Sequence, residues 1–349
     1  MKIALITDQH FGARKNSKLF HDFFLKFYND VFFPTLKEEG ITTIVDMGDT
    51  FDNRTGINFS SLKWAKDNYY DVLESMGCKI HTIVGNHTAF YKNTNNVNAV
   101  DLLLREYKNV EVYSEPSEVT IDGLKLMFIP WINKENEETT FKLLKKTTSK
   151  IAMGHLELRG FAANKQCIME HGHESKLFKK FTKVFSGHYH TRSNDQNIYY
   201  TGNAYEIYWN DVNDVRGFTI FDTETLEHRF VNNPYSIFHH VYYEDTDYKT
   251  FDFSKYQDMI VKVIVRKKSN NKNFEKFIDK FYVANVADLK IIESQDFNGW
   301  YSKDQIEEIE SENTLSLLNK YIQESEIDLD KSELSKIVKE VYQEACEMI

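Results

Sequence analysis

Two histidines two residues apart, His188 and His190, follow directly after an apolar run that ends in a glycine, residues 184–187. In an extended backbone, residues i and i+2 point to the same side, so both imidazoles can face one small region. Imidazoles gathered in this way bind a metal ion or transfer a proton. Taken alone, the pair could equally be two surface histidines, so its interpretation depends on what the rest of the chain brings to the same place.

The same arrangement, an apolar run followed by residues of metal-ligand type, occurs four more times earlier in the chain. The runs 2–7, 41–47, 79–84 and 150–153 each predict a buried strand. The candidate ligands that follow the five strands are Asp8, His10, Asp49, Asn86, His155, His188 and His190. Because helical stretches separate the strands, we expect helices layered on sheets, with functional groups gathered at the carboxyl ends of the strands.

These donors are nitrogen and oxygen atoms without a thiolate, a set that suits Mn, Fe or Zn better than Ca. Seven donors are too many for one ion that keeps open positions, so we expect two ions. Asp49 is the natural shared ligand because it is the only carboxylate on a middle turn. Two such ions can hold a phosphate group and activate water, which predicts hydrolysis of a phosphate ester. His87 cannot point the same way as Asn86, so it is free to give a proton to the leaving oxygen.

Composition is typical of a soluble globular protein. The 349 residues are 41% hydrophobic and 28% charged, and the net charge of −10 argues against a protein that coats nucleic acid through bulk positive charge. The three cysteines, Cys78, Cys167 and Cys346, lie far apart, which favours a reducing compartment. The chain opens on a strand and has no apolar stretch of about 20 residues, so we expect a cytoplasmic protein without a membrane segment.

The predicted elements divide the chain into four parts. Residues 1–234 alternate strands and helices, and residues 235–295, with strands at 259–265 and 289–292 around a helix at 273–281, predict a small α+β capping domain. Residues 296–313 are acidic and poor in apolar positions, which is typical of a linker. Residues 314–349 predict a helical segment. The expected fold class is therefore α/β, a layered helix/β-sheet/helix domain with a capping domain and a C-terminal helical segment.

The helical segment carries apolar stripes that suggest a binding partner. Asp330, with Glu333 three residues later, is a start signal for the last helix, whose apolar residues then recur at helical spacing. The predicted partner-binding residues are Leu315, Leu318, Ile322, Leu334, Ile337, Val338, Val341 and Tyr342. The alternative is that the stripe packs back on its own chain.

The motifs D-x-H, G-D-x-x-D, G-N-H, G-H and G-H-x-H, in this order over residues 1–222, resemble those of the calcineurin-like metallophosphoesterase family. G-D-T-F-D, P-W-I and G-H-Y-H resemble more narrowly the SbcD group, nuclease subunits that work with an SbcC ATPase, and its bacteriophage counterparts. The resemblance implies a catalytic histidine at His87. It also implies two metal ions, Mn preferred over Mg, one held by Asp8, His10, Asp49 and His190 and the other by Asp49, Asn86, His155 and His188.

The resemblance further implies a Mn-dependent DNA exonuclease or endonuclease that acts in DNA repair, recombination and replication, in a bacterial cell or a phage-infected host. The implied partners are DNA and the coiled-coil base of an SbcC-like ATPase, with a homodimer of this chain inside a heterotetramer. The family forms its dimer through helices that match residues 60–75 and 98–107. The alternative for the apolar residues of these helices is the core of the domain.

One position departs from the family pattern. Many relatives have an acidic residue after G-N-H, and this chain has Thr88, so His87 lacks an orienting carboxylate next to it in sequence. We expect Asp52, three residues after Asp49, to orient His87 instead, as the matching aspartate does in related phosphatases. The alternative is that Asp52 is a surface loop carboxylate.

The candidate DNA contacts are Arg159 and Lys165 in the loop 156–174, and Arg266, Lys267 and Lys268 after a predicted strand. A solvated strand end explains the last three equally well. The alternative function is a phosphatase or phosphodiesterase that acts on small phosphate esters. We favour the nuclease because a small-molecule esterase does not need residues 238–292 or the terminal helices, and we disfavour a non-enzymatic scaffold because all seven ligand positions hold competent residues.

Overall fold

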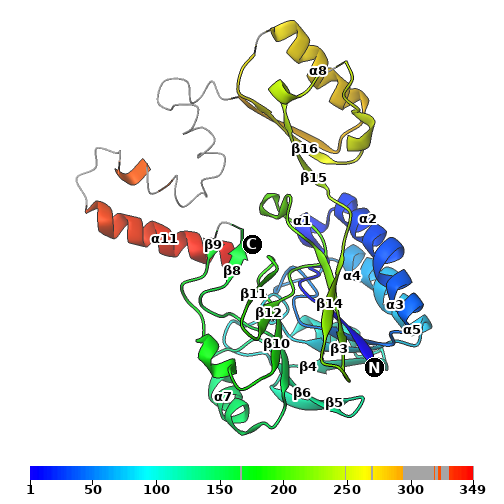
Figure 1. Ribbon diagram of the computed structural model, residues 1–349, viewed down its shortest axis with the longest axis vertical. Helices are drawn as coiled ribbons and strands as arrows, with labels where there is room; N and C mark the ends of the chain where they lie inside the picture. The colour runs from blue at the N-terminus through cyan, green and yellow to red at the C-terminus, as the bar shows by residue number, and fades with distance from the viewer. Residues whose placement is uncertain are drawn as a thin grey trace. The chain divides into compact units, whose positions relative to one another are not determined.

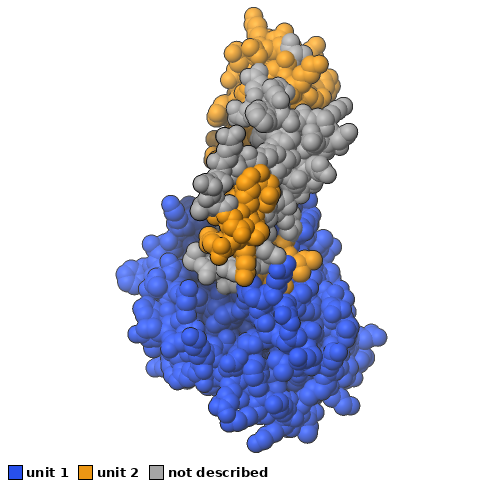
Figure 2. All heavy atoms as spheres, turned by 90° about the vertical axis from the view of Figure 1, so that its left-hand side faces the viewer, with its two compact units in different colours: residues 1–165, 170–237 blue, residues 166–169, 238–349 orange. Residues whose placement is uncertain are grey.

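The structure is a computed structural model that describes residues 1–165, 167–247, 249–268, 270–293, 318, 321–323 and 330–348. The chain divides into two compact units, which Figure 2 shows in different colours. Unit 1 comprises residues 1–165 and 170–237, and unit 2 comprises residues 166–169 and 238–349. The fold is mixed α/β, which confirms the predicted class. The predicted linker 296–313 lies outside the described residues.

Unit 1 contains two six-stranded sheets. The first has the order β14-β13-β1-β2-β3-β4 and the second has the order β11-β12-β10-β7-β6-β5. The strands of the first sheet are β1 (Lys2–Ile6), β2 (Thr43–Asp46), β3 (Lys79–Ile83), β4 (Val110–Tyr113), β13 (Gly217–Asp222) and β14 (His228–Asn232). The strands of the second are β5 (Ser117–Ile121), β6 (Leu124–Ile129), β7 (Ile151–His155), β10 (Lys183–Gly187), β11 (Ser193–Asp195) and β12 (Ile198–Tyr200). Strands β1 to β4 are parallel to one another, as are β6, β7, β10 and β12, so each set ends at one edge of its sheet.

The two sheets pack face to face around one hydrophobic core. Leu5 and Val45 from the first sheet meet Phe128, Met153 and Phe185 from the second, and all five side chains are fully buried. Strands that are covered on both faces read as continuous apolar runs, which is why the central strands were visible in the sequence. The core therefore fixes the two sheets relative to each other inside unit 1.

Helices cover the outer faces of the sheets (Figure 1). Along the first sheet run α2 (Lys18–Phe27) and α3 (Phe33–Glu39), joined by the π-helical turn Tyr28–Phe32. On α2 the aromatic side chains Phe20, Phe24 and Phe27 are buried. Two further segments, α4 (Phe59–Ala65) and α5 (Asp71–Ser75), are joined by the π-helical turn Lys66–Tyr70. The remaining helices of unit 1 are α1 (Ala13–Asn16), α6 (Ala99–Leu104) and α7 (Glu137–Lys146).

Several elements differ from the sequence-based expectation. Strands β5, β11 and β14 were not predicted, because they are short or carry charged and polar residues at the sheet edges. The segment Ser175–Phe178, before β10, forms a 3-10 turn. The loop 156–174 contains two short strands, β8 (Ala162–Asn164) and β9 (Cys167–Ile168).

Unit 2 contains a three-stranded sheet, β15 (Phe238–Tyr242), β16 (Ile260–Val265) and β17 (Asp288–Glu293), with α8 (Asn271–Val283). All three strands are parallel, and α8 makes the crossover from β16 to β17. Its core joins Val261 and Val263 of the central strand to Phe277 and Phe281 of the helix. The sequence predicted β16, α8 and β17 but not β15, whose two histidines mask its apolar character.

The last helix, α11 (Lys331–Met348), begins where its start signal predicted. The Asp330 carboxylate accepts hydrogen bonds from the backbone N–H groups of Ser332 (2.9 Å) and Glu333 (3.4 Å). On this helix Ile337 and Val341 are 50% and 59% exposed. Of the shorter strip, Leu318 is exposed, Ile322 is buried and Leu315 lies outside the described residues. Nowhere in the described part of the chain is a helix both long and apolar enough to cross a membrane.

Candidate metal centre

The predicted ligands lie together in unit 1, where β1, β2, β3, β7 and β10 end. Their donor atoms form two groups, in each of which all atoms lie within 4.8 Å of one another: Asp8, His10 and His190 in the first, and Asp49, His155 and His188 in the second. Each group takes residues from both sheets, because Asp8, His10 and Asp49 follow strands of the first sheet and the other histidines come from β7 and β10 of the second. The parallel strand ends thus meet as the sequence predicted.

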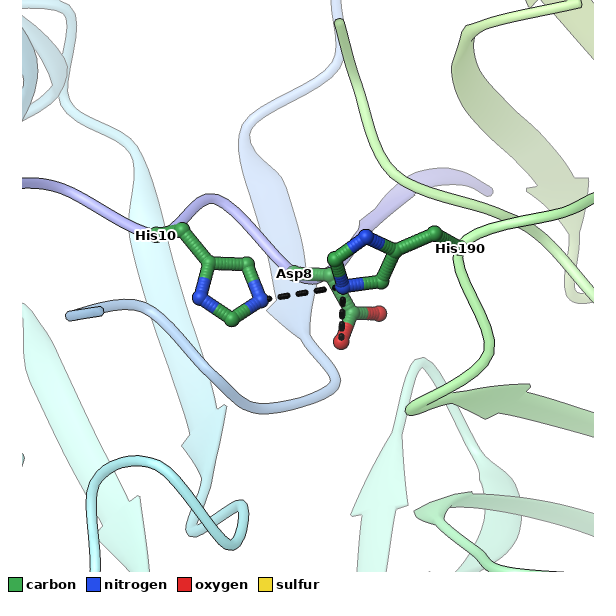
Figure 3. Close-up of side chains that lie close together, drawn as sticks. All are labelled: Asp8, His10 and His190. Carbon is green, nitrogen blue, oxygen red and sulfur yellow. Dashed lines mark hydrogen bonds and ion pairs between the residues drawn. The ribbon is translucent and has the colours of Figure 1, made fainter. Parts of the chain in front are cut away.

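The first group, shown in Figure 3, faces three donor atoms toward one point. The Nε2 atoms of His10 and His190 lie 3.1 Å apart, and His190 Nε2 lies 4.0 Å from Asp8 Oδ1. The Asp8 carboxylate also accepts hydrogen bonds from the Thr7 hydroxyl (2.7 Å) and from the backbone N–H of His188 (3.0 Å). These bonds fix the carboxylate and leave one oxygen directed at the two imidazoles.

The second group brings lone pairs together around His155. Its Nδ1 donates to the backbone carbonyl of Met47 at 2.9 Å, so in the neutral imidazole Nε2 carries a lone pair. That Nε2 lies 2.9 Å from Asn86 Oδ1 and 3.1 Å from Asp49 Oδ2, both of which can only accept. His188 Nδ1 lies 3.1 Å from the same Asn86 oxygen. Converging lone pairs repel one another unless a cation or a proton lies between them, so this arrangement fits either a bound cation or a proton on His155 Nε2.

The charges of the buried histidines follow from their neighbours. Burial opposes the charged form of His155, but the Asp49 carboxylate more than offsets it and raises the pKa of His155 to about 9. Burial lowers the pKa of His188 and of His190 well below the usual value, and the neighbouring imidazoles His155 and His10 lower them further. Unprotonated imidazole is the form that binds a metal ion, so His188 and His190 are already in that form, whereas His155 gives up a proton when an ion binds.

Four of the predicted ligands have strained backbones. The φ angles are 51° at Asp8, 45° at His10, 53° at Asp49 and 87° at His188, a left-handed region that non-glycine residues rarely adopt. Such a residue costs about 1–3 kcal/mol, and strain of this kind gathers at functional sites. Backbone hydrogen bonds of 2.9 Å, from Asp8 N to Gly48 O and from His10 N to Asp49 O, hold the first two turns in place.

Two glycines are required by close approach around the second group. A Cβ atom on Gly85 would lie 2.2 Å from Asp49 Oδ1, and one on Gly48 would lie 2.5 Å from His155 Nδ1. Gly48 also has a φ of 107°. The glycines of G-D and G-N-H therefore let the turns come close enough for their side chains to share one point.

His87 lies at the rim of the same site and is partly exposed. Its backbone N–H donates to Asp49 Oδ1 at 2.8 Å, and its Nδ1 donates to the backbone carbonyl of Asp52 at 2.8 Å. Because a carbonyl can only accept, Nδ1 carries a hydrogen and Nε2 is the nitrogen left for a substrate proton. Thr88, where the chain departs from the family pattern, stabilises the G-N-H turn. Its buried hydroxyl accepts a hydrogen bond from Gly85 N (3.1 Å) and donates one to Gly85 O (3.0 Å).

The prediction that the Asp52 carboxylate orients His87 is wrong. Only the backbone carbonyl of Asp52 contacts His87, and the carboxylate lies 3.2 Å from Nδ1 of His10. A carboxylate on the far nitrogen of a ligand histidine fixes the tautomer and leaves Nε2 free to bind. The sequence could not show this, because the direction of the Asp52 side chain depends on where the Asp8–His10 turn lies.

A buried arginine behind His190 was not predicted. Arg216 is 2% exposed and donates to the backbone carbonyl of His190 and to the Asn203 side chain. Its Nη2 lies 2.9 Å from both the Asp211 and the Asp214 carboxylates. This network holds in place the backbone of the G-H-x-H turn, which follows β10 of the second sheet. The signal available in the sequence was an arginine directly before an apolar strand, with two aspartates just upstream.

A second buried network joins two of the ligand turns. The Asp46 carboxylate accepts from the Gln9 side chain (3.0 Å), from the Thr50 hydroxyl (2.6 Å) and from the backbone N–H of Gly48 (3.1 Å). Gln9 in turn accepts from the Tyr28 hydroxyl at 2.6 Å. Burial raises the pKa of Asp46 to about 7. Asp46 was visible as a charge inside an apolar strand, a position that needs a partner.

The two basic residues predicted in the loop 156–174 are paired. Arg159 forms an ion pair with Glu174, and Lys165 Nζ lies 3.8 Å from the Asp214 carboxylate. Pairing with a carboxylate lowers the positive charge that each presents to a phosphate chain.

In unit 2, the predicted basic residues after β16 also have neighbours. The Arg266 guanidinium lies 4.8 Å from the ring of Tyr242, and Lys268 Nζ lies 2.5 Å from the Glu293 carboxylate. Lys267 is exposed. DNA binding by the five predicted contact residues remains a prediction.

Comparisons with known proteins place the chain in a family. It is 31% identical to exonuclease subunit 1 of Enterobacteria phage T4 over 348 residues, 99% of each chain. No family model matches. Among solved structures, an archaeal phosphodiesterase shares 13% identity at a TM-score of 0.33, over 67% of this chain and 100% of its own. A dimetal phosphatase from Danio rerio shares 11% identity at a TM-score of 0.36, over 63% of this chain and 91% of its own.

The match to the phage protein runs through all five motifs and both units, so it covers the complete candidate metal centre. The chain therefore belongs to the calcineurin-like metallophosphoesterase family and is a metal-dependent phosphodiester hydrolase.

Proposed function

We propose that the chain is the nuclease subunit of a DNA repair and recombination complex, and that it hydrolyses phosphodiester bonds of DNA with two divalent ions, Mn²⁺ preferred over Mg²⁺. The observation that carries this proposal is the pair of donor groups, each drawn from both sheets, in a chain that matches an exonuclease subunit over its whole length. Nitrogen and oxygen donors without a thiolate agree with Mn²⁺.

In this proposal Asp8, His10 and His190 hold one ion, and Asn86, His155 and His188 hold the other. Asp49 is the shared ligand. Its Oδ2 lies 3.1 Å from His155 in the second group, and its backbone carbonyl accepts a hydrogen bond of 2.9 Å from the N–H of His10 in the first. The converging lone pairs around His155 and the short distance between the His10 and His190 nitrogens support this division.

Bound ions would neutralise phosphate charge and supply an activated water for in-line attack. The protein's own contribution is to position groups around that reaction. In this proposal His87 acts in its doubly protonated form: the Asp52 carbonyl holds the Nδ1 hydrogen, and the Nε2 hydrogen is the one given to the leaving oxygen. The Asp52 carboxylate keeps His10 in the tautomer whose Nε2 can bind.

The remaining parts of the chain have proposed roles outside the chemistry. Residues 1–234 form the nuclease domain, 235–295 a capping domain that contacts DNA, 296–313 a linker and 314–349 a partner-binding segment. The exposed Ile337 and Val341 on α11 support the last role, since an apolar helix face suits docking on another helix. The proposed partner is an SbcC-like ATPase, with two copies of each subunit in the cytoplasmic complex.

The test compares hydrolysis of DNA and of bis(p-nitrophenyl) phosphate, each with Mn²⁺ and with Mg²⁺. We expect Mn²⁺-dependent cleavage of DNA by the full chain, no cleavage by Asp49→Ala, and normal cleavage by the control Asp67→Ala, an exposed aspartate paired with Lys63. Near-normal Mn²⁺-dependent activity in Asp49→Ala would contradict the shared ligand. Hydrolysis of the small ester without any cleavage of DNA would favour the small-ester phosphodiesterase instead.

A further inference from the structure

The backbone makes a left-handed turn directly after the D-x-H motif, in α1 (Figure 1). The φ angles of Arg14, Lys15 and Asn16 are 55°, 60° and 61°. L-residues avoid this region because Cβ meets the backbone, and only the asparagine has a side chain that commonly compensates. Three such residues in succession persist only where the surroundings hold them.

The turn is held from two sides. On the metal-centre side, Ala13 N donates to the carbonyl of His10 at 2.9 Å, and Asn16 N donates to Gly12 O at 2.9 Å. On the other side, the hydroxyl of Ser61, a fully buried residue of α4, donates to Asn16 Oδ1 at 2.7 Å. The position of the turn is therefore tied both to a predicted metal ligand and to the helix layer.

The Arg14 guanidinium lies near two aromatic rings, and its carbon is 5.8 Å from the ring of Phe20 on α2. The guanidinium carbon lies 6.0 Å from the ring of Tyr208, and that ring lies 6.2 Å from the ring of His190, nearly parallel to it. Burial raises the pKa of Tyr208, the Asp52 carboxylate raises it further and Arg14 lowers it, so both charges act on the same phenol. Arg14 thus lies at the edge of the site, one aromatic ring away from His190.

Arg14 and Lys15 are also exposed, and neither has a carboxylate partner in the described part of the chain. Lys18, four residues after Arg14, is different because its Nζ lies 2.5 Å from the Asp22 carboxylate. In a chain of net charge −10, an exposed arginine near the candidate metal centre, with an exposed lysine next to it in sequence, is suited to a polyanion that must approach carboxylates.

We propose that the left-handed turn forms a phosphate subsite, in which Arg14 and Lys15 bind backbone phosphates of the nucleic acid that flank the bond being cleaved. The subsite rests on the proposed nuclease function and adds to it the element that distinguishes a polynucleotide from a small diester. The strain has a reason in this proposal, because the left-handed backbone sets the direction in which Arg14 leaves the turn, toward Tyr208.

The test measures DNA affinity by fluorescence anisotropy over a range of salt concentrations, with full-length His87→Ala protein and Mn²⁺ so that DNA is bound without turnover. Each phosphate contact contributes about 0.7 to 0.9 to the slope of log K against log salt. We expect Arg14→Ala and Lys15→Ala each to lower the slope by about this amount, and the matched control Lys18→Ala to leave it unchanged. Ser61→Ala should weaken DNA binding in the same way, because it releases Asn16.

A second measurement separates this subsite from the metal centre. With His87 intact, Arg14→Ala should lower kcat/KM for DNA about tenfold while kcat/KM for bis(p-nitrophenyl) phosphate and calorimetric Mn²⁺ affinity stay unchanged. Equal salt slopes for Arg14→Ala, Lys15→Ala and Lys18→Ala would overturn the subsite, and so would an equal loss of activity on both substrates, which would show that the turn supports the metal ligands. Failure of the unaltered chain to bind and cleave DNA would overturn the proposed function as well.

Discussion

Replacement of Asp52 distinguishes the contact seen in the structure from the role expected by family resemblance. The Asp52 carboxylate lies 3.2 Å from His10 Nδ1, while His87 Nδ1 contacts the backbone carbonyl of Asp52, which a side-chain substitution leaves in place. Loss of a carboxylate behind a ligand histidine typically costs 10- to 100-fold in metal affinity. That factor corresponds to about 1.4–2.8 kcal/mol.

We therefore expect Asp52→Asn to weaken Mn²⁺ binding 10- to 100-fold at one of two sites, and to regain most of its kcat at saturating Mn²⁺. Calorimetric titration of the metal-free protein and a Mn²⁺ titration of activity measure both quantities. Asp67→Asn is the control, since Asp67 is exposed and pairs with Lys63 on the surface. A large fall in kcat at saturating Mn²⁺ with unchanged metal affinity would refute the reasoning and restore Asp52 as the partner of His87.

Four further outcomes are expected. His87→Ala should keep its metal and bind DNA but turn over about 10²–10⁴-fold more slowly; loss of bound Mn²⁺ would make His87 a ligand. Arg216→Met should lower the free energy of unfolding in urea by about 3–5 kcal/mol, because it leaves the buried Asp211 carboxylate without its cation; a loss below about 1 kcal/mol would show that the pair is dispensable. Burial lowers the pKa of His81 from 6.5 to about 4, so between these pH values His81 is protonated in the unfolded chain but neutral in the folded chain. The stability that depends on neutral His81 is complete above pH 6.5, and the free energy of unfolding falls by up to about 3 kcal/mol as the pH drops to about 4. His81→Gln should make the free energy of unfolding depend less steeply on pH, which urea titrations at several pH values measure. An unchanged pH dependence would contradict this role of His81. A chain that ends at Asn313 should remain folded and cleave single-stranded DNA with Mn²⁺ but no longer co-purify with the ATPase; undiminished co-purification would remove the terminal helices as the main tether.

The sequence predicted the parts of the fold that burial dictates. Strands covered on both faces, such as Ile151–His155, appear as apolar runs, and the ligands at their ends could be placed at one edge of a parallel arrangement. The edge strands His228–Asn232 and Ser193–Asp195 are half-exposed and polar, so their pattern does not differ from that of a loop. β15 was missed for the same reason, since two histidines interrupt it.

The candidate ligands were found because residue type and strand ends are local properties. The contacts that orient them are not local. Asp52 lies 42 residues from His10 in sequence, and Arg216 lies 26 residues from His190, so only the docked sheets decide which atoms face each other. Strain at Arg14 and Lys15 is likewise invisible in the sequence, because neither residue type signals a left-handed backbone.

Each donor group takes residues from both sheets, and this determines when during folding the group can form. His10 and His190 are 180 residues apart, and neither group is complete until the two sheets have packed together. The ions cannot therefore direct early folding. They act afterwards as cross-links between the two packed sheets, at the edge where the ligand-bearing strands end. At a free concentration one hundred times its dissociation constant, an ion that binds only the packed form adds about 2.7 kcal/mol to stability. A chelator should accordingly loosen this edge first, as faster amide exchange in the ligand turns before any exchange in the core strands.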